Sequence, residues 1–500
     1  MAQSLAKQNP SQNKFDELVR LLSDRLWRLE NLYYIQDKDG NKVKFKLNRA
    51  QRRFYKRIWY FNVILKSRQL GFSTFILIYI LDALLFNPNK SAGVIAHSLE
   101  DAKKLFRNKI KFAYDNLPDE IKQMVSAVQD SSNSMVFSNG SSISVGTSLR
   151  GGTLQYLHVS ELGKIAAKYP EKAREIKTGA LNTVSVGQQI FIESTAEGQG
   201  GLFYELCQYS EQLGDEGKDL SAMDPRFHFF PWYEDKTYTL DFEVPITDEL
   251  QKYFDSLDIE LTKGQKAWYA KKSQSMGDDM LREFPSTSRE SFQTSVEGTY
   301  FVREMSFLRK EGRIGSFSWD PAKKVYTFWD IGLSDEMSIV FMQQDGKDFN
   351  IIDYYENSGE GLQHYIDYLD SKPYSYDEHY WPHDGVKRDQ VTASELYKTA
   401  MRLGMKRINI VPRTQDLASD IQATRNFLPR CRFDAIKCDI LIKHLGNYRK
   451  KWNDRLGVWH DQPLHDPASH GADAFRCLAI GFREKQPIVK ERIEMNDWSR

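Results

Sequence analysis

The segment from Lys66 to Thr74, KSRQLGFST, combines one glycine with cations and hydroxyls, and it lies between an apolar run and a longer apolar segment. A strand followed by such a loop and a helix is where backbone N–H groups and a helix N-terminus can hold a triphosphate. Against the pattern G-x-x-x-x-G-K-[ST], Gly71 and Ser73 match, whereas Phe72 stands at the lysine position. The segment predicts a nucleotide-binding loop of unusual sequence, with an ordinary strand–helix turn as the alternative.

The loop needs a cation and a hydroxyl to serve a nucleotide. A positive charge is required at the β- and γ-phosphates, and either Lys66 or Arg68 could supply it. The Ser73 hydroxyl would then bind Mg²⁺, with Thr74 behind it. The candidate nucleotide-binding residues of the loop are Lys66, Ser67, Arg68, Gln69, Leu70, Gly71, Phe72, Ser73 and Thr74.

Two later apolar segments end in groups that could act on the same nucleotide. LQYLHVSELG ends in Ser160 and Glu161, the position of the acids that follow a strand in P-loop ATPases. Glu161 could orient and deprotonate the attacking water. Ser160 stands where an aspartate usually binds Mg²⁺, so metal binding would depend more on Ser73 and on water. QIFIEST ends in Ser194 and Thr195, whose hydroxyls could sense the γ-phosphate.

Three aspartates in the C-terminal half form a second candidate site. Asp330 closes the strand VYTFWD, Asp384 follows an aromatic run, and Asp473 lies at an expected helix start. Two-metal nucleases use carboxylates to bridge and flank two Mg²⁺ or Mn²⁺ ions. Each aspartate alone could equally be a turn or helix-cap residue. Only the fold can bring residues this far apart in sequence together.

The elements that would position these groups follow two patterns. From Phe61 to about residue 200, short apolar runs alternate with helical stretches, which predicts a parallel α/β sheet. The stretch from about 205 to 320 is looser and is expected to be a connecting region with partial structure. Near Lys324, three short strands separated by turns predict an antiparallel meander, and helix and strand units continue to about residue 483, with a helix from His470.

The N-terminal part is expected to add a helix and a hairpin. Apolar residues from Phe15 to Leu26 recur at helical spacing, and Asp39-Gly40 is a hairpin signal between two short apolar segments. The sequence therefore predicts a helical and hairpin lead-in followed by two α/β domains.

Charge and length limit the class of protein. The chain has 500 residues and 41% hydrophobic residues, which is enough for several cores. Sixty-nine Lys+Arg against 68 Asp+Glu give a net charge of +1, so any surface for a polyanion must be local. The runs Lys42–Arg68 and Lys443–Arg455 are both rich in cations. Each could contact nucleic-acid phosphates or form an ordinary solvated face.

The cysteines and the apolar runs indicate the cellular compartment in which the protein is expected. The four cysteines form no CxxC pair, which disfavours a disulfide scaffold and a structural zinc site and makes a reducing cytosol the default. The N-terminus is polar, and the longest apolar run, Phe75 to Leu81, is far shorter than a membrane span. The expectation is a soluble intracellular protein without a membrane partner.

In order and spacing, SRQLGFST, HVSELGK and FIESTAEG resemble the ATPase of the large terminase subunit of tailed bacteriophages, the motor that packages viral DNA. The resemblance implies a P-loop ATPase of the additional-strand catalytic glutamate type. It makes Lys66 the phosphate-binding lysine, Gln51 an adenine-reading residue and Arg150 a candidate arginine finger. Gln51 could also be a plain polar residue on a helix, and Arg150 an ordinary surface arginine.

The order strand-Asp, strand-Asp, helix-Asp and the segment HDPASHGADAF resemble the ribonuclease H-like nuclease domain of the same family. The resemblance implies that Asp330, Asp384 and Asp473 bind Mg²⁺, with Mn²⁺ able to substitute. The sequence does not rank the further candidates for ligands or neighbouring groups, which are Asp335, Glu356, Asp466 and His470.

The resemblance also implies a domain order. The expected segments are a lead-in at 1–45, the ATPase at 46–235, a linker or lid at 236–318, the nuclease at 319–485 and a tail at 486–500. The implied catalytic residues are Lys66, Arg150, Glu161, Asp330, Asp384 and Asp473.

The implied activity is ATP-driven movement of double-stranded viral DNA through a portal into a procapsid, with cleavage of concatemeric DNA. ATP and Mg²⁺ are the implied cofactors. The implied partners are the small terminase subunit, the portal protein and further copies of the chain in a ring, expected to be a pentamer. The implied location is the host cytoplasm, outside the mature virion.

Two other functions stay open. A helicase-nuclease of DNA repair would share both kinds of site, but no further helicase motifs follow FIEST. A non-catalytic DNA-binding assembly protein with decayed sites would account for the departures at Phe72 and Ser160.

Overall fold

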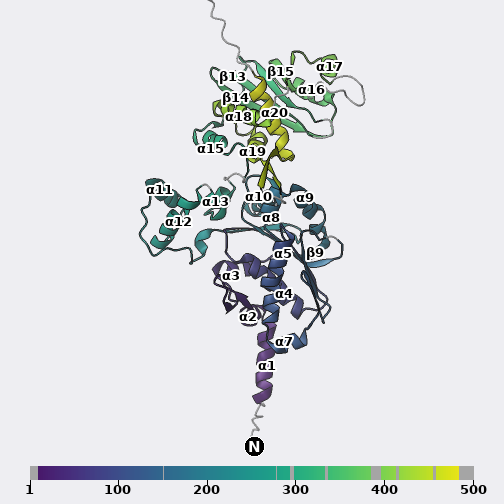
Figure 1. The fold of residues 1–500 in the computed structure, drawn as a ribbon, viewed down its shortest axis with the longest axis vertical. Coiled ribbons are helices and arrows are strands. Elements are labelled where there is room, and N and C mark those ends of the chain that lie inside the picture. Colours follow the sequence, from purple (N-terminus) through teal and green to yellow (C-terminus); the bar gives the residue numbers. More distant parts are fainter. Residues whose placement is uncertain are drawn as a thin grey trace, which may run out of the picture. The chain divides into compact units, whose positions relative to one another are not determined.

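The computed structural model describes residues 10–149, 151–277, 279–292, 298–332, 336–383, 396–412, 416–453 and 458–482 (Figure 1). The chain divides into two compact units, Met1–Val296 and Glu297–Arg500. None of the helices in these described ranges is both long enough and apolar enough to cross a lipid bilayer.

The first unit is built on an eight-stranded sheet in the order β10-β3-β9-β8-β4-β7-β6-β5. The strands from β10 to β7 are parallel, and β6 and β5 continue the sheet as antiparallel strands. The strand bounds are β3 (Phe61–Lys66), β4 (Ser91–Ile95), β5 (Ala127–Asp130), β6 (Ser134–Phe137), β7 (Ser142–Gly146), β8 (Leu154–Ser160), β9 (Val184–Ser194) and β10 (Pro225–Phe230). Strand β9 lies between β3 and β8, so the additional-strand order expected from the sequence is confirmed.

Helices cover both faces of this sheet. The largely apolar helix α4 packs with Ile64 and Phe191 on one face, whereas α8 to α10 pack with Leu65 and Ile192 on the other. Because side chains alternate along a strand, the even-numbered residues of β3 and β8 face α4, and so do the odd-numbered residues of β9. The helices from the lead-in to α10 are α1 (Pro10–Ser23), α2 (Arg25–Asn31), α3 (Arg49–Tyr55), α4 (Phe72–Phe86), α5 (Leu99–Leu105), the π-helix η1 (Phe106–Lys111), α6 (Phe112–Asp115), α7 (Asp119–Met124), α8 (Leu162–Lys168), α9 (Pro170–Thr178), the short η2 (Ala180–Thr183) and α10 (Gly201–Asp215).

A buried ion pair attaches the lead-in to α4. Asp82 is fully buried within α4 and accepts bonds from Arg28 Nε and Nη2 at 2.9 and 2.8 Å and from the Tyr33 hydroxyl at 3.0 Å. Removing one partner of such a buried pair typically costs about 3–5 kcal/mol. The pair therefore fixes α2 against the helix that follows the candidate nucleotide loop.

The second unit contains a seven-stranded sheet in the order β11-β17-β14-β13-β12-β15-β16. β12, β13 and β14 form the expected antiparallel meander, and β15 and β16 run parallel to β12. Counted from β12 as the first strand, the central order is 3-2-1-4-5 with only the second strand reversed, which is the strand order of ribonuclease H-like folds. The bounds are β11 (Ile314–Gly315), β12 (Val325–Asp330), β13 (Met337–Asp345), β14 (Asp348–Asn357), β15 (Tyr376–Pro382), β16 (Ile408–Val411) and β17 (Cys431–Asp434), with a separate pair β18 (Lys450–Asn453) and β19 (Val458–Pro463).

Two groups of helices cover the two faces of this second sheet, as Figure 1 shows within the unit. Helices α18, α19 and α20 pack on the face of Phe328 and Val340, whereas α16 and α17 pack on the face of Trp329 and Ile339. The helix bounds are α15 (Val302–Lys310), α16 (Leu362–Asp370), α17 (Leu396–Arg402), α18 (Leu417–Phe427), the short η5 (Leu428–Arg430), α19 (Asp439–Asn447) and α20 (Pro467–Gly481). Helix α20 thus begins three residues before the expected start at His470.

The structure refines two other expectations. The expected hairpin forms as β1 (Tyr34–Gln36) and β2 (Lys42–Lys44), but the helical run before it is two helices, because Asp24 caps a new one with its side chain. The segment expected as a linker is divided between the units. Its first part forms a helical group beside the first sheet (Figure 1), and α15 and β11 belong to the second unit. The elements of that first part are α11 (Asp248–Ser256), α12 (Lys263–Met276), α13 (Asp279–Glu283) and α14 (Ser288–Ser291), and the short η3 (Trp232–Glu234) ends just before it.

Candidate functional site

The candidate nucleotide loop joins the end of β3 to the start of α4. Gly71 precedes the helix with φ of 76°, a left-handed conformation that favours glycine. A Cβ at this position would lie 2.8 Å from Gln51 Nε2, which donates to the Gly71 carbonyl at 2.9 Å. Gln69 is also left-handed, with φ of 59°. The loop is therefore a strained, tightly held turn at the N-terminus of an apolar helix, where backbone N–H groups can meet an anion.

The two candidate cations of the loop lie in different surroundings. Lys66 is 5% exposed, and its Nζ lies 3.2 Å from both Glu161 Oε1 and Glu193 Oε2. Although burial by itself lowers the pKa of Lys66, these two carboxylates raise it well above its ordinary value, so the side chain is charged. Arg68 is exposed and pairs with Glu283 at 2.8 Å. The geometry favours Lys66 over Arg68 as the cation of the site.

Phe72 does not replace the usual lysine chemically. Its ring is buried and packs against Phe230, with ring centroids 4.4 Å apart, and against Phe54 at 5.7 Å. The departure from the usual pattern is therefore a core contact of α4.

Glu161 stands at the turn between β8 and α8 in a left-handed conformation, with φ of 57°. Such backbone strain in a residue other than glycine is typical of functional sites. Its side chain is 34% exposed, and its two oxygens contact Lys66 at 3.2 Å and Ser194 Oγ at 3.4 Å. The Ser194 hydroxyl in turn accepts the N–H of Gly163 at 3.0 Å, which links the end of β9 to the first turn of α8.

Glu193 is the residue that the sequence reasoning missed. It is fully buried at the end of β9, and its Oε1 accepts the hydroxyls of Ser73 at 2.6 Å and Ser160 at 2.9 Å. His158 Nε2 lies 3.4 Å from the same oxygen. A glutamate inside the apolar run QIFIEST is the signal that could have found it, because buried acids are rare unless they are paired.

The remaining predicted nucleotide-site residues surround this cluster. Gln51 is buried, and its amide is bonded to Gly71 and to the Asn48 N–H. Ser67, Leu70 and Thr195 are also buried, whereas Thr74 is partly buried in the first turn of α4. The candidate arginine finger Arg150 lies outside the described residues.

The second unit brings several of the expected nuclease residues to one end of its sheet. Asp330 pairs directly with Ser338, and Ser338 with Glu356, so the two acids share the face covered by α20. Asp330 Oδ2 lies 3.3 Å from His470 Nδ1 on that helix. Burial raises the pKa of Asp330, and the nearby charge of Asp473 adds to the rise.

Asp473 follows His470 along α20 and is held by two partners. Its Oδ1 accepts the Tyr448 hydroxyl at 2.9 Å and Arg476 Nη1 at 2.6 Å. Glu356 accepts the Tyr354 hydroxyl at 2.6 Å, and burial raises its pKa. These contacts favour Glu356 and His470 as the further groups of the site.

The other nuclease candidates either pair with a different residue or lie outside the described residues. Asp466 precedes α20 and pairs with buried Arg449 at 3.0 Å. Asp384 and Asp335 lie outside the described residues. Within the described ranges, no three His, Cys, Asp or Glu side chains form a group that could hold a metal ion. The carboxylates present are hard oxygen donors of the kind that suits Mg²⁺ or Mn²⁺.

The two basic runs do not form uniform surfaces. In the first run, Lys66 belongs to the site, whereas Arg52 and Arg53 pair with Glu30 and Glu234. In the second run, Lys443, Arg449 and Lys450 all pair with aspartates, and His444 lies 3.5 Å from Glu356; Arg455 lies outside the described residues.

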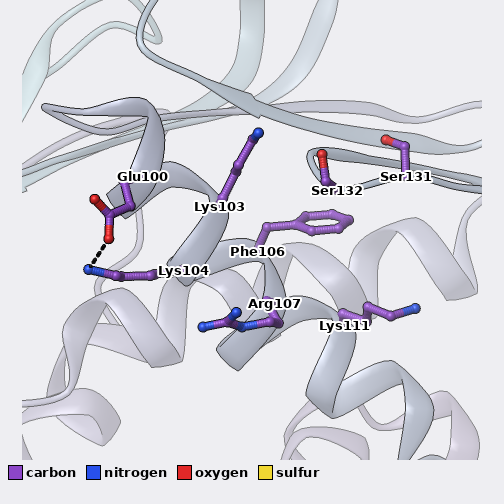
Figure 2. A pocket seen from close by; sticks show the side chains of 8 residues that line it. All are labelled: Glu100, Lys103, Lys104, Phe106, Arg107, Lys111, Ser131 and Ser132. Carbon is purple, nitrogen blue, oxygen red and sulfur yellow. Dashed lines mark ion pairs between the residues drawn. The ribbon is translucent and has the colours of Figure 1, made fainter.

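A different basic surface lies along α5 and η1. A pocket of about 460 Å³ is lined by Lys103, Lys104, Arg107 and Lys111 together with Glu100, Phe106 and the serines of the β5–β6 turn. Figure 2 shows these side chains from close by. Lys104 pairs with Glu100 at 2.8 Å, and Lys111 pairs with Asp130. Lys103 and Arg107 are exposed. The sequence predicts only a helix over this stretch, and this basic surface was not among the candidates.

No protein-family model matches the chain, and no curated protein matches it. Among solved structures, the chain is similar to large terminases of phages. The large terminase from a thermophilic bacteriophage, in complex with ATP-gamma-S, is 11% identical over 87% of this chain and 98% of that chain, with a TM-score of 0.30. The ATPase domain of the large terminase from Thermus phage P74-26 is 14% identical over 48% of this chain and 94% of that chain, with a TM-score of 0.31. The nuclease domain from bacteriophage SPP1 with bound Mn is 14% identical over 31% of this chain and 84% of that chain, with a TM-score of 0.25. At these identities and scores, the assignment of function depends on the residues and geometry of this chain.

Proposed function

We propose that the first unit hydrolyses ATP at the loop between β3 and α4. The observation that supports this most directly is a cluster from separate elements, in which Lys66 pairs with Glu161 and also with Glu193, and Glu193 accepts the Ser73 hydroxyl. Phosphoryl transfer requires groups of these kinds. Lys66 is a buried cation, Ser73 provides a hydroxyl at the start of a helix, and Glu161 is a strained glutamate at the end of β8, two strands away from β3 in the sheet. The strand order β3-β9-β8 supplies that spacing.

Each group has a defined task in this proposal. The N–H groups at the start of α4 and the Lys66 ammonium bind the phosphate oxygens and neutralise their charge. Glu161, which is accessible on one side, orients the attacking water and accepts its proton. The hard oxygens around Ser73 fit Mg²⁺, which when bound would neutralise charge on the β- and γ-phosphates. Ser194 connects Glu161 to β9 and would transmit the loss of the γ-phosphate.

The decisive test compares ATP hydrolysis by the wild-type chain and by Glu161→Ala, in the presence of double-stranded DNA. We expect wild-type turnover and a loss of at least about 100-fold in the variant. A wild-type chain without turnover, in the presence of DNA and assembly partners, would contradict the ATPase proposal.

For the second unit, we propose a metal-dependent endonuclease centred on Asp330 and Asp473. Support comes from the strand order and from α20, which places its acid at the same end of the sheet as Asp330. Asp384 is part of the proposal by resemblance. Asp330→Ala and Asp473→Ala are expected to abolish plasmid cutting in Mn²⁺ while ATP hydrolysis continues. Cutting by both variants at the wild-type rate would eliminate this assignment.

Together, the two proposed activities correspond to a large terminase subunit that moves double-stranded DNA into a procapsid and cuts it. The small terminase subunit, the portal protein and a ring of further copies, expected to be a pentamer, belong to this proposal, as does the host cytoplasm as its location. A helicase-nuclease is disfavoured, because the second unit has an antiparallel meander where a second motor domain would have a parallel sheet. Measured ATP turnover would also exclude a non-catalytic assembly protein.

A further inference from the structure

The proposed ATP site lacks an acid where P-loop enzymes usually have one. In those enzymes the loop hydroxyl and an aspartate at the end of a neighbouring strand hold Mg²⁺. Here Ser160 ends that strand, and its uncharged hydroxyl cannot balance a dication. The site therefore needs a negative charge from another element.

Glu193 supplies a carboxylate at this place from the adjacent strand. In the parallel pairing of β8 and β9, Ser160 is directly opposite Glu193, and both side chains face α4. The Ser160 hydroxyl donates to Glu193 Oε1 at 2.9 Å. The acid thus lies one strand away from its usual position but reaches the same point.

The hydrogen bond with Ser73 gives this carboxylate a defined effect on the metal site. Ser73 Oγ donates its proton to Glu193 Oε1 at 2.6 Å. A hydroxyl has one proton and two lone pairs, so this bond leaves the oxygen lone pairs of Ser73 for a cation. The other oxygen, Oε2, is buried; among the described residues it accepts no hydrogen bond and has only the ion pair with Lys66.

The negative charge of Glu193 has a second effect on the proposed Mg²⁺ site. Lys66 is shared between Glu161 and Glu193, so one positive charge faces two carboxylates in a mostly buried cluster. Glu193 Oε1 accepts two hydroxyl bonds and Oε2 faces the Lys66 ammonium, and each of these contacts favours the carboxylate form. The ionised cluster has an excess negative charge that a divalent cation would neutralise.

We infer that Glu193 is the positioning residue of the Mg²⁺ site, replacing the acid that is absent at Ser160 by orienting the Ser73 hydroxyl and supplying the missing negative charge. This inference rests on the proposed ATPase function. A purely structural ion pair between Glu193 and Lys66 would make the same contacts but would not affect the metal dependence of nucleotide binding.

The test measures the affinity of the full chain for a fluorescent, non-hydrolysable ATP analogue in Mg²⁺ and in EDTA. The ratio of the two dissociation constants gives the magnesium dependence. In Glu193→Gln, which keeps an acceptor for Ser73 but removes the charge, we expect that ratio to fall by about 10- to 100-fold. Adding Ser160→Asp to this variant is expected to restore it, because the acid returns to its usual strand.

Matched variants separate the possible outcomes. Glu290→Gln removes another mostly buried carboxylate, which caps α14 and contacts Tyr253, and is expected to keep the wild-type ratio. An unchanged ratio in Glu193→Gln, or a failure of Ser160→Asp to restore it, would overturn the inference while leaving the ATPase proposal intact. A wild-type chain that binds the analogue under neither condition would overturn both. If Glu193→Gln does not fold, Glu193→Asp replaces it, because the shorter side chain keeps the charge but no longer reaches the Ser73 hydroxyl. We expect a lower ratio in that variant, and an unchanged ratio would overturn the inference.

Discussion

At the scale of single residues, the site depends on which side chain of a short loop turns inward. Lys66 is the last residue of β3 and faces α4, so alternation along the strand directs it toward Glu193 on β9. Arg68, two residues later, has left the strand and pairs with Glu283 on the helical group. Neighbouring cations in one motif thus have separate tasks.

Removal of the Lys66 charge should therefore damage catalysis more than removal of the Arg68 charge. Lys66→Ala leaves two acids without their shared cation and is expected to lower kcat/KM for ATP by about 100- to 1,000-fold. Arg68→Ala is expected to have a much smaller effect. Steady-state hydrolysis at several ATP concentrations measures both. A larger effect in Arg68→Ala would assign the phosphate contact to that residue instead.

A buried histidine predicts the acid sensitivity of the first unit. His228 lies against the Phe54 ring and bonds to Asn62 at 3.2 Å, and burial lowers the pKa of this histidine to about 3. Its pKa in the unfolded chain is about 6.5. Neutral, buried His228 therefore makes its full contribution to the free energy of unfolding above about pH 6.5. This contribution is lost as pH falls toward 3, by at most about 1.4 kcal/mol per pH unit.

His228→Gln is expected to reduce the difference in melting temperature between about pH 7.5 and about pH 5. His460→Gln, which changes an exposed histidine, should leave that difference unchanged. Circular dichroism melts at the two pH values measure it. An identical difference in wild type and His228→Gln would show that other groups cause the acid sensitivity.

At the scale of elements, the active geometry depends on how closely α8 approaches the end of β9. Gly163 lies in the first turn of α8, and a Cβ there would lie 2.7 Å from the Thr195 carbonyl oxygen and 2.8 Å from Ser194 Oγ. The absence of a side chain at this position lets the helix start directly beneath Glu161. The proposed catalytic residue Glu161 is thus positioned by a helix–strand contact as well as by its own strand.

Gly163→Ala should disturb this contact. We expect a decrease of about 1–3 kcal/mol in stability, together with slower ATP hydrolysis as Glu161 moves from its position. The matched change Gly214→Ala lies in α10, where a Cβ would meet nothing within 4 Å, and should stabilise that helix by about 0.5–1 kcal/mol. Chemical denaturation and ATPase assays measure both effects. Unimpaired hydrolysis by Gly163→Ala would mean that the contact does not position Glu161.

At the scale of the whole molecule, a net charge of +1 requires that any grip on DNA be local. Arg52, Arg53, Lys443 and Arg449 of the two basic runs pair with acids, and Lys66 belongs to the site, whereas Lys42, Lys44, Lys46, Arg49, Lys56 and Arg57 are exposed. The surface of α5 and η1 in Figure 2 offers exposed Lys103 and Arg107 beside the paired Lys104 and Lys111. This surface is therefore a second candidate in the first unit for contact with the phosphate backbone, beside the exposed cations of the first basic run.

Reversal of charge on this surface should weaken DNA binding. Lys103→Glu with Arg107→Glu is expected to lower affinity for double-stranded DNA and to reduce the slope of log affinity against log salt by about 1 for each phosphate that the variant no longer binds. Hydrolysis without DNA should stay unchanged. The control pair Lys263→Glu with Lys271→Glu makes the same charge change at exposed positions of α12. Equal decreases in both pairs would indicate only a general charge effect.

Residue types and their spacing were enough to predict the local chemistry and the order of the elements along the chain. Residue types and periodicity predict a loop between an apolar strand and an apolar helix, and acids at the ends of later strands. The expected parallel sheet and the expected antiparallel meander both form. The candidates Lys66, Ser73 and Glu161 were identified in this way, as were Asp330, Asp473 and His470.

Which of these groups come into contact depends on the register of the strands in the folded chain. The registers of β3, β9 and β8 bring residues about 30 and 130 positions apart together, and no local pattern encodes such a register. For this reason Glu193, which looked like part of an apolar strand, became the partner of Ser73 and Ser160, and Phe72 became a core residue. Strand register also favours Glu356 over Asp466 as a further group of the candidate nuclease site. Cross-strand pairing aligns Glu356 with Asp330, whereas Asp466 is paired with Arg449.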